Sequence, residues 1–221
     1  MSRSAWNPRS VAASSLKALS ALALAALLQP AHSATPKLSH DPIDFTADSV
    51  FIDQKKGTST WRKVRIAQDN IVLTADSAQS NGTAVEHAFD DSRWTFRGSV
   101  KLSKDDAVLN ADEAQATFLA NALIQVSANG KPANFQQRLQ KSGKLAQGHS
   151  DNIDYDVPKG LIRLSKNAWL TNGDNETRAE SIKYNMQEQT VAADGAEGST
   201  KGVHIIITQP PQKPPVNPPN P

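Results

Sequence analysis

The sequence has no cysteine, and aromatic residues make up only 5% of its 221 positions. Without thiols the chain can form neither a disulfide nor a thiolate metal site, so core packing and backbone pairing must hold the fold. It also has no glycine-rich phosphate loop and no G-x-S-x-G nucleophile motif. These absences give no support to a nucleotide-dependent or serine-hydrolase function.

The residue types that usually carry catalysis or bind metals are scattered along the chain. The histidines beyond residue 34 match no metal-ligand spacing: His40, His87, His149 and His204. The pairs Asp90-Asp91 and Asp105-Asp106 fall at predicted turns, where aspartate is favoured for local hydrogen bonding. We expect no catalytic residue, no cofactor and no metal. A secreted β-sandwich hydrolase is the weakest interpretation, because no acid–base pair is evident.

The N-terminal segment has the order of a secretory signal peptide. Basic residues precede the apolar stretch Ala18–Leu28, and Pro30–Ala34 ends it with mainly small residues. The apolar stretch is shorter than the roughly 20 residues that a membrane-spanning helix requires. We therefore predict a signal peptide over residues 1–34, cleaved after Ser33 or Ala34. The alternative is an uncleaved N-terminal anchor, which retention of Met1 in the mature protein would support.

Cleavage would change the net charge. The whole chain carries 24 basic and 22 acidic residues, a net charge of +2. Removal of Arg3, Arg9 and Lys17 leaves 21 basic residues against the same 22 acidic ones, a net charge of −1. A slightly acidic chain lacks the basic excess that nucleic-acid binding needs, so we expect no nucleic-acid partner. The remaining length suits one domain with a sizeable core.

What the sequence does contain is a repeated pattern, clearest over Trp94–Asp112. Apolar residues occupy every second position up to Leu102, with only Gly98 interrupting. The polar triplet Lys104–Asp106 follows, and alternation resumes over Ala107–Ala111. Alternation with a period of two is typical of a strand with one buried face, and a polar triplet between two such runs is typical of a hairpin turn.

The same strand–turn–strand pattern occurs three times with the same internal spacing. Twelve residues separate the first apolar residue from the closing acidic one in Val64–Asp76, Val100–Asp112 and Ala168–Glu180. In the third copy the turn is Asn172–Asp174. Hairpins repeated in this way indicate one supersecondary unit stacked on itself.

The rest of the chain is also strand-like. Further alternating runs are Ile43–Phe45, Val50–Ile52, Ala114–Phe118, Ala122–Ala128, Ile153–Val157, Leu161–Leu170, Ile182–Met186 and Val203–Ile207. Residues 113–122 also contain helix formers, but their place after an Ala-Asp pair favours a strand. We predict turns at Asn81-Gly82 and at Asn129–Pro132. Many short strands predict an all-β sandwich, barrel or jelly roll over residues 43–208. Residues 35–42 form a loose leader, and the proline-rich residues 209–221 a disordered tail.

Several motifs, taken in order, resemble the OstA-like domain of the LptA family of periplasmic lipopolysaccharide-transport proteins. The resemblance covers about residues 43–207 and lies in Gly130–Phe135, Gly148–Ser150, Ile153–Tyr155, Ile162–Leu170 and Ile182–Tyr184. It implies an antiparallel β-jelly roll, open at both ends, whose apolar interior shields lipid A acyl chains. It also implies a periplasmic carrier or bridge that moves lipopolysaccharide from the inner to the outer membrane of a Gram-negative cell.

Family members join end to end, which implies a head-to-tail homo-oligomer. They also join LptC-like inner-membrane and LptD-like outer-membrane OstA domains. By this resemblance, the candidate joining edges are Ile43–Phe45 and Val203–Ile207. The chain departs from the family pattern by having two hairpin units, at Val64 and Val100, before the Gly130 motif, where one is expected. The Trp94 hairpin is therefore a candidate insertion.

The inward row of apolar residues would form the lipid track. The predicted lipid-binding residues are Val64, Ile66, Leu73, Trp94, Phe96, Val100, Leu102, Leu109, Ile124, Ile162, Leu164, Leu170, Ile182 and Tyr184. The alternatives are a dry β-scaffold of the same fold, in which these residues pack only on one another, and an LptC-like membrane-anchored partner.

Overall fold

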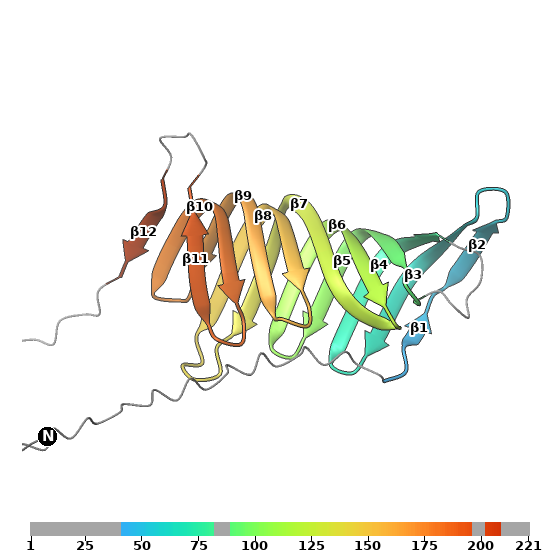
Figure 1. The fold of residues 1–221 in the computed structure, drawn as a ribbon, viewed down its shortest axis with the longest axis horizontal. Coiled ribbons are helices and arrows are strands. Elements are labelled where there is room, and N and C mark those ends of the chain that lie inside the picture. The colour runs from blue at the N-terminus through green and yellow to red at the C-terminus, as the bar shows by residue number, and fades with distance from the viewer. Residues whose placement is uncertain (1–40, 82–88, 196–201, 209–221) are drawn as a thin grey trace, which may run out of the picture. The chain divides into compact units, whose positions relative to one another are not determined.

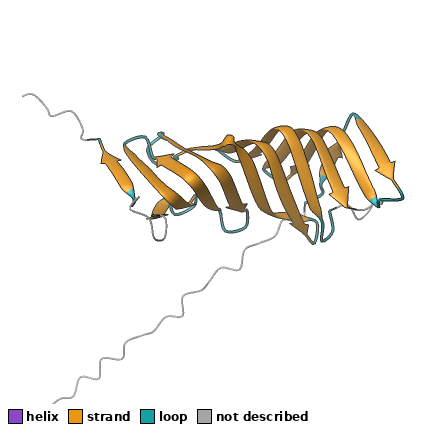
Figure 2. Ribbon diagram, turned by 90° about the horizontal axis from the view of Figure 1, so that it is seen from above, coloured by secondary structure: helices purple, strands orange, loops and turns teal. Residues whose placement is uncertain are grey.

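A computed structural model describes residues 41–81, 89–195 and 202–208. The predicted signal peptide, the proline-rich tail, most of the leader and the second residue of the Asn81-Gly82 turn lie outside these ranges. Within them every regular element is a β-strand, as Figure 2 shows. The described residues include no helix long and apolar enough to cross a membrane.

The described residues form twelve strands. They are β1 (Asp44–Thr46), β2 (Ser49–Asp53), β3 (Thr58–Gln68), β4 (Ile71–Asn81), β5 (Arg93–Lys104), β6 (Ala107–Leu119), β7 (Ala122–Arg138), β8 (Leu145–Asp156), β9 (Leu161–Thr171), β10 (Asn175–Asn185), β11 (Thr190–Asp194) and β12 (His204–Ile207). All belong to one antiparallel sheet, in which β3 to β10 pair in chain order (Figure 1). Neighbours in sequence are thus neighbours in space, as a stack of hairpins requires.

The repeated hairpin is confirmed by the pairing register. In β3–β4 Val64 lies opposite Ala75, and in β5–β6 Val100 lies opposite Ala111. In β9–β10 Ala168 lies opposite Ala179. The spacing of twelve therefore sets the same cross-strand pair in each copy. Both hairpin units that precede Gly130 are present.

A line of irregularities crosses the sheet and bends it. The register shifts in every successive pair from β4–β5 to β9–β10, for example between Arg97 and Val100 and between Asn129 and Ala133. Positive φ angles occur along the same line, at Lys63, Gly98 and elsewhere. Bulges bend strands, so each long strand divides into two halves. We call this feature the bulge line.

The two sets of half-strands form two layers. Layer 1 contains β2, residues 58–62, 77–81, 93–97, 113–119, 122–129, 152–156, 161–165 and 181–185, and β11. Layer 2 contains β1, residues 64–68, 71–75, 100–104, 107–110, 133–138, 145–150, 168–171 and 175–179, and β12.

Contacts between half-strands that do not pair show that the layers face each other. Phe45 of β1, in layer 2, packs edge-on against Trp61 of layer 1, with ring centroids 4.9 Å apart. Phe135 of β7 and Tyr184 of β10 have ring centroids 5.8 Å apart, although β7 and β10 do not pair. The sheet is therefore folded over an apolar interior, which is the jelly-roll arrangement that the sequence predicts.

Two local predictions need correction. Asn129–Pro132 is not a turn but an irregularity inside β7, which runs on to Arg138 and includes a cis Lys131–Pro132 bond. Because Gly and Pro mark bulges as well as turns, local sequence alone did not separate the two. No alternating pattern indicated β11, whose only large apolar residue is Val191. Residues 113–119 form part of β6, so the strand interpretation is confirmed.

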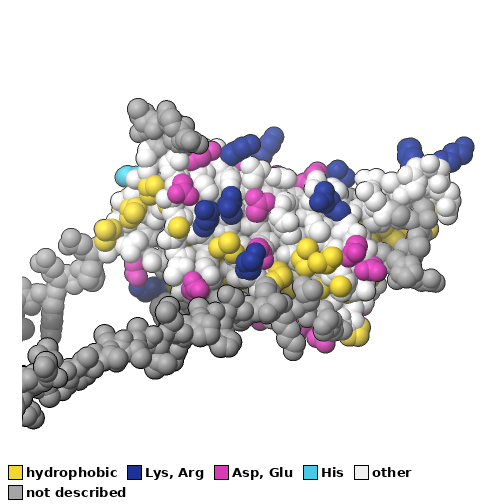
Figure 3. All heavy atoms as spheres, viewed as in Figure 1, with side chains coloured by type: hydrophobic (Ala, Val, Ile, Leu, Met, Phe, Trp, Pro, Cys, Tyr) yellow, Lys and Arg dark blue, Asp and Glu magenta, His cyan; other side chains and the backbone are white. Residues whose placement is uncertain are grey.

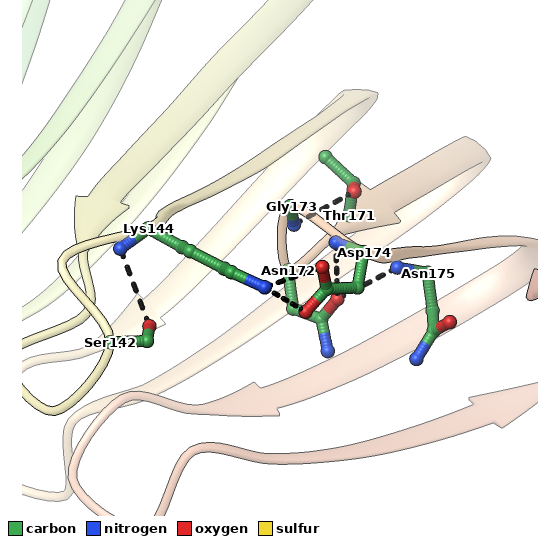
Figure 4. A network of polar contacts seen from close by, with 7 residues as sticks. All are labelled: Ser142, Lys144, Thr171, Asn172, Gly173, Asp174 and Asn175. Atoms are coloured by element: carbon green, nitrogen blue, oxygen red, sulfur yellow. Dashed lines mark hydrogen bonds and ion pairs between the residues drawn. The ribbon is translucent and has the colours of Figure 1, made fainter. Parts of the chain in front are cut away.

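The predicted turn at Asn172–Asp174 is present, and side chains stabilise it (Figure 4). The Asn172 carboxamide oxygen accepts hydrogen bonds from the backbone N–H groups of Asp174, at 3.1 Å, and Asn175, at 2.9 Å. The Lys144 ammonium lies 2.5 Å from the Asp174 carboxylate. This ion pair joins the loop before β8 to the turn before β10.

The outer faces of the strands carry mixed charge. Arg97 and Glu113 lie directly opposite each other on β5 and β6, with Nε and Oε2 3.0 Å apart. The Lys63 ammonium hydrogen-bonds to Asp76 at 2.6 Å and holds the pKa of that carboxyl below its usual value. Figure 3 shows basic and acidic side chains interspersed over the face in view. Such exposed pairs contribute little to stability, because water and salt screen them.

Gly98 offers a test of the bulge line. A Cβ at this position would lie 2.6 Å from Oδ2 of Asp76, and the backbone has φ = +75°. Gly57 also has positive φ, but a Cβ added there would meet nothing within 4 Å. Gly57→Ala should therefore cost only the strain of about 1 kcal/mol, whereas Gly98→Ala should cost roughly 2–3 kcal/mol. Urea denaturation of both variants measures the difference, and equal losses would contradict the proposed close approach at the bulge.

Candidate functional site

The interior between the layers is the candidate site, and most of the predicted lipid track lies there. Thirteen of the fourteen predicted residues are buried in the core: Val64, Ile66, Leu73, Trp94, Phe96, Val100, Leu102, Leu109, Ile162, Leu164, Leu170, Ile182 and Tyr184. Their neighbours on the opposite face are open to solvent, as Arg163 between Ile162 and Leu164 illustrates. The structure therefore brings these thirteen residues together in one interior.

Ile124 is the exception. It is only half-buried and lies outside the core, whereas Leu123 and Val126 are buried. The register between β6 and β7 shifts here, because Phe118 pairs with Leu123 and Thr117 with Gln125, which leaves Ile124 between them. The alternation on β7 thus changes phase, and the assignment of Ile124 to the inward face was wrong.

The sequence reasoning also missed several interior residues. Trp61 is buried, but three positions separate it from Val64, because the positive-φ residue Lys63 changes the phase of β3. Other large core residues absent from the predicted set are Phe89, Phe118, Phe135, Ile153 and Tyr155. For Phe118, Ile153 and Tyr155 the alternation itself was a usable signal. For Trp61 the phase change removed it.

Six aromatic side chains gather at the β1 end of the interior. Trp94 is fully buried and stacks on Phe89, with ring centroids 4.9 Å apart and planes 6° apart. It also stacks on Phe96, at 6.1 Å, and meets the edge of Phe45, at 5.6 Å. Trp61 and Phe118 complete this aromatic cluster. The cluster joins the layers at this end, because Phe45 belongs to layer 2 and Trp61 and Trp94 to layer 1.

Towards β10 the interior is mainly aliphatic. Ile153, Leu164 and Ile182 are all fully buried there. Tyr184 crosses between the layers, because its hydroxyl donates a 2.9 Å hydrogen bond to Oε1 of Gln137, and burial raises the pKa of this tyrosine. A cavity lined by Leu102, Leu109, Phe135, Tyr155, Ile162 and others has a volume of only about 10 Å³. Apolar side chains thus already fill this part of the interior.

A separate polar groove of about 850 Å³ follows the bulge line. Its lining residues include Asp112, Asn129, Lys131, His149 and Asp151. Of these, His149 stacks on Trp169, at 4.9 Å between ring centroids. Within the described ranges no three His, Asp or Glu residues lie close enough to hold a metal ion. The groove belongs to the outward faces of the bulges and is distinct from the apolar interior.

Comparison with known proteins identifies the family to which this fold belongs. Residues 79–190, about half of the chain, match the family model described as LptA/(LptD N-terminal domain) LPS transport protein. The chain belongs to this family. Because the match includes β5 and β6, the Trp94 hairpin lies inside the family domain, and most of the Val64 hairpin precedes the match.

Individual relatives agree with the family. The lipopolysaccharide export system protein LptA of Escherichia coli K12 is 28% identical over 117 residues, which are 52% of this chain and 63% of that protein. The chain thus spans less than two thirds of that relative's length. The lipopolysaccharide export system protein LptH of Pseudomonas aeruginosa is 26% identical over 167 residues, 75% of each chain.

A solved structure supports the fold. The chain matches a crystal structure of LptH from P. aeruginosa, described as the LptA-homologous periplasmic component of the lipopolysaccharide transport device. The TM-score is 0.50 at 22% sequence identity, over 77% of this chain and 96% of that one. This match establishes the OstA-like jelly-roll fold, in agreement with the resemblance in sequence.

The aromatic cluster predicts where stability is concentrated. Trp94 is fully buried among other rings, so Trp94→Ala should lower the free energy of unfolding by about 3–5 kcal/mol through lost contacts and the cavity left behind. Phe51 on β2 is 68% exposed, and Phe51→Ala should change it by less than about 0.5 kcal/mol. Chemical denaturation monitored by circular dichroism measures both. A small effect at Trp94 would mean that the cluster does not hold the layers together.

Proposed function

We propose that the protein is a periplasmic, non-enzymatic carrier or bridge for lipopolysaccharide, which shields lipid A acyl chains between its two layers. The observation that carries this proposal is the buried apolar interior of the family fold, which runs from Trp94 on β5 to Ile182 on β10. The names of the relatives, which are lipopolysaccharide export and transport proteins, support the choice of ligand.

The interior has the chemistry that such a cargo needs. Exposure of an acyl chain of about twelve carbons to water costs roughly 10 kcal/mol of free energy, at about 0.8 kcal/mol per methylene. A carrier must replace that exposed surface with apolar contacts. Leu102, Leu109, Leu164 and Ile182 offer such contacts without a polar group among their side chains.

The tight packing favours a second candidate, a dry scaffold that only joins other sheets. The small volume of the cavity beside Leu109 and Phe135 supports this alternative, because an acyl chain can enter only if the layers separate. Mass spectrometry of lipids that co-purify with the protein distinguishes the candidates. Bound lipid A supports the carrier, and its consistent absence after gentle extraction supports the scaffold.

The two ends of the sheet suit head-to-tail assembly. At one end β1 and β2 divide the edge of β3, and at the other β12 and β11 divide the edge of β10. Each layer of the described structure thus has ten antiparallel segments, so its first and last segments run in opposite directions. A second copy added end to end would place its β2 beside β11 and its β1 beside β12, both antiparallel, and so continue both layers.

The end strands also expose apolar side chains. Phe51 of β2 is 68% exposed and Ile207 of β12 is 72% exposed, while Val50 and Ile205 are exposed beside them. Strand addition at such edges is a common mode of protein association. We propose that the same edges join further copies of this chain as well as LptC-like and LptD-like OstA domains at the inner and outer membranes. The predicted edges Ile43–Phe45 and Val203–Ile207 correspond to β1 and β12, and β2 and β11 extend them.

The carrier proposal predicts which positions contact lipid. A photo-reactive residue placed at Phe96 or Leu164, both fully buried in the interior, should capture lipopolysaccharide in cells. The matched positions Thr95 and Arg163 point to the other face and should capture little. Gel shifts probed with an antibody against lipopolysaccharide give the readout. Capture confined to Thr95 and Arg163 would reverse the assignment of faces.

The assembly proposal predicts an effect of charge at an edge. Phe51→Glu should weaken self-association about tenfold or more, because an unpaired carboxylate would have to be buried beside the incoming strand. Gln115→Glu, on an exposed position in the middle of the sheet, is the matched control. Sedimentation velocity over a concentration series measures the shift towards monomer. An unchanged distribution for Phe51→Glu would exclude β2 from the joining surface.

A further inference from the structure

The two layers meet again on the side opposite the bulge line, where the hairpin turns lie. Turns of layer 2, such as Asp105-Asp106, approach turns of layer 1, such as those at Gly160 and Gln187, around a shared pocket. We call this side the mouth.

Few side-chain hydrogen bonds cross the mouth in the described part of the chain. Near β1, the buried Gln68 side chain donates from Nε2 to the backbone oxygens of Asn121, at 2.7 Å, and Asp41, at 2.9 Å. Towards β10, the Tyr184 hydroxyl donates to Gln137 at 2.9 Å. The Gln68–Asn121 and Tyr184–Gln137 bonds each join one layer to the other, whereas Asp41 lies just before β1, on the same layer as Gln68. Separation of the layers here would break these two hydrogen bonds together with the apolar contacts beneath them, such as that between Phe135 and Tyr184.

A polar pocket of about 220 Å³ lies in the mouth beside the Tyr184–Gln137 bond. Its rim is formed by Lys104, Asp105, Gln137, Gln140, Gln187 and Gln189. Three of its lining residues, Lys104, Tyr155 and Met186, also line the small apolar cavity beneath it. The pocket is thus polar at the rim and adjoins the small apolar cavity through these three residues.

Tyr155 provides an independent sign that this pocket receives a polar group. Only 4% of the residue is exposed, and its hydroxyl has no hydrogen-bond partner in the structure. Burial, together with the nearby Asp105 and Asp156 carboxylates, raises the pKa of this tyrosine, so the hydroxyl keeps its proton at neutral pH. A buried hydroxyl without a partner is costly. Because the hydroxyl itself is out of reach of solvent in this structure, a ligand oxygen or amide would supply the missing bond once the rim of the pocket opens around it.

We propose that the pocket in the mouth binds the sugar head of an acylated saccharide, whose acyl chains pass the floor into the interior. This inference rests on the carrier function proposed above and locates the polar part of its cargo. The glutamines of the rim and Tyr155 offer donors and acceptors of the kind that sugar hydroxyls and amides use. Among the residues that line the pocket, Lys104 is the one cation, and two aspartates, Asp105 and Asp106, line the pocket with it. The pocket therefore suits sugar oxygens better than a phosphate group.

The absence of cysteine from the chain permits a direct test. Single variants Gln140→Cys and Gln187→Cys each place one thiol on the rim, and Gln115→Cys places one on the exposed outer face of β6. We expect lipid A to slow alkylation by a maleimide at both rim positions and to leave the rate at position 115 unchanged. Phosphatidylethanolamine, which has acyl chains but no sugar, should protect the rim much less.

Tyr155→Phe tests the hydroxyl itself. It keeps the buried ring, removes the unpartnered group and should leave the thermal midpoint at or above that of the unaltered protein. We expect it to weaken binding of lipid A up to about tenfold, the value of one hydrogen bond, without changing binding of phosphatidylethanolamine.

The outcomes separate this inference from the carrier proposal. If the unaltered protein binds lipid A but the rim thiols react at the same rate with and without it, the pocket assignment fails and the carrier function stands. Equal affinities of Tyr155→Phe and the unaltered protein for lipid A would also overturn the role of the hydroxyl. If the unaltered protein binds no lipid A at all, both proposals fail.

Discussion

The bulge line is the constraint on which the rest of the structure depends. A flat antiparallel sheet of hairpins would expose one apolar face along its full length, and this chain has no disulfide and no helix in its described residues to cover it. Register shifts in six successive strand pairs fold strands β4 to β10 at corresponding points. Each half-strand then buries its apolar row against the opposite layer. The interior, the mouth and the divided edges all follow from this fold.

Much of the fold was predictable because it depends on local sequence patterns. Alternation identified most strands, and the spacing of twelve in Val64–Asp76 and its copies identified hairpins whose register the structure repeats. The bulges were not predictable in the same way, since a bulge adds or removes one residue and so reverses the phase of everything beyond it. That reversal explains the error at Ile124 and the omission of Trp61. The Gly-Lys-Pro segment at 130–132 was identified as a break, but its role inside β7 depends on pairing with β8.

The ends of the sheet differ from the edges that soluble proteins usually protect. Edge strands are commonly short or charged, which prevents pairing with other chains. Here the end strands are short, but Val50, Phe51 and Ile52 lie exposed on β2, and Ile205–Ile207 lie exposed on β12. Because each layer of the described residues has an even number of antiparallel segments, the proposed end-to-end contact would add further copies without a break in polarity and would not close on itself. Exposure that would be a liability in a monomer is therefore consistent with an assembling bridge.

The packed interior and the proposed carrier function can be reconciled by the uneven way in which the layers are held. At the β1 end, Phe45, Trp61, Phe89 and Trp94 interlock across the layers, and the loss of such contacts costs several kcal/mol. Towards β10, aliphatic side chains face each other and the hydrogen bond from Tyr184 to Gln137 crosses the mouth. In the proposed carrier, an entering acyl chain would replace aliphatic contacts with similar ones, which would lower the net cost of separating the layers there. The same chain could not replace the ring-on-ring stacking of the aromatic cluster so closely. The sequence of core residues from β1 to β10 therefore favours opening at the aliphatic end, beside the pocket that contains Tyr155, while the aromatic end keeps the two layers in register.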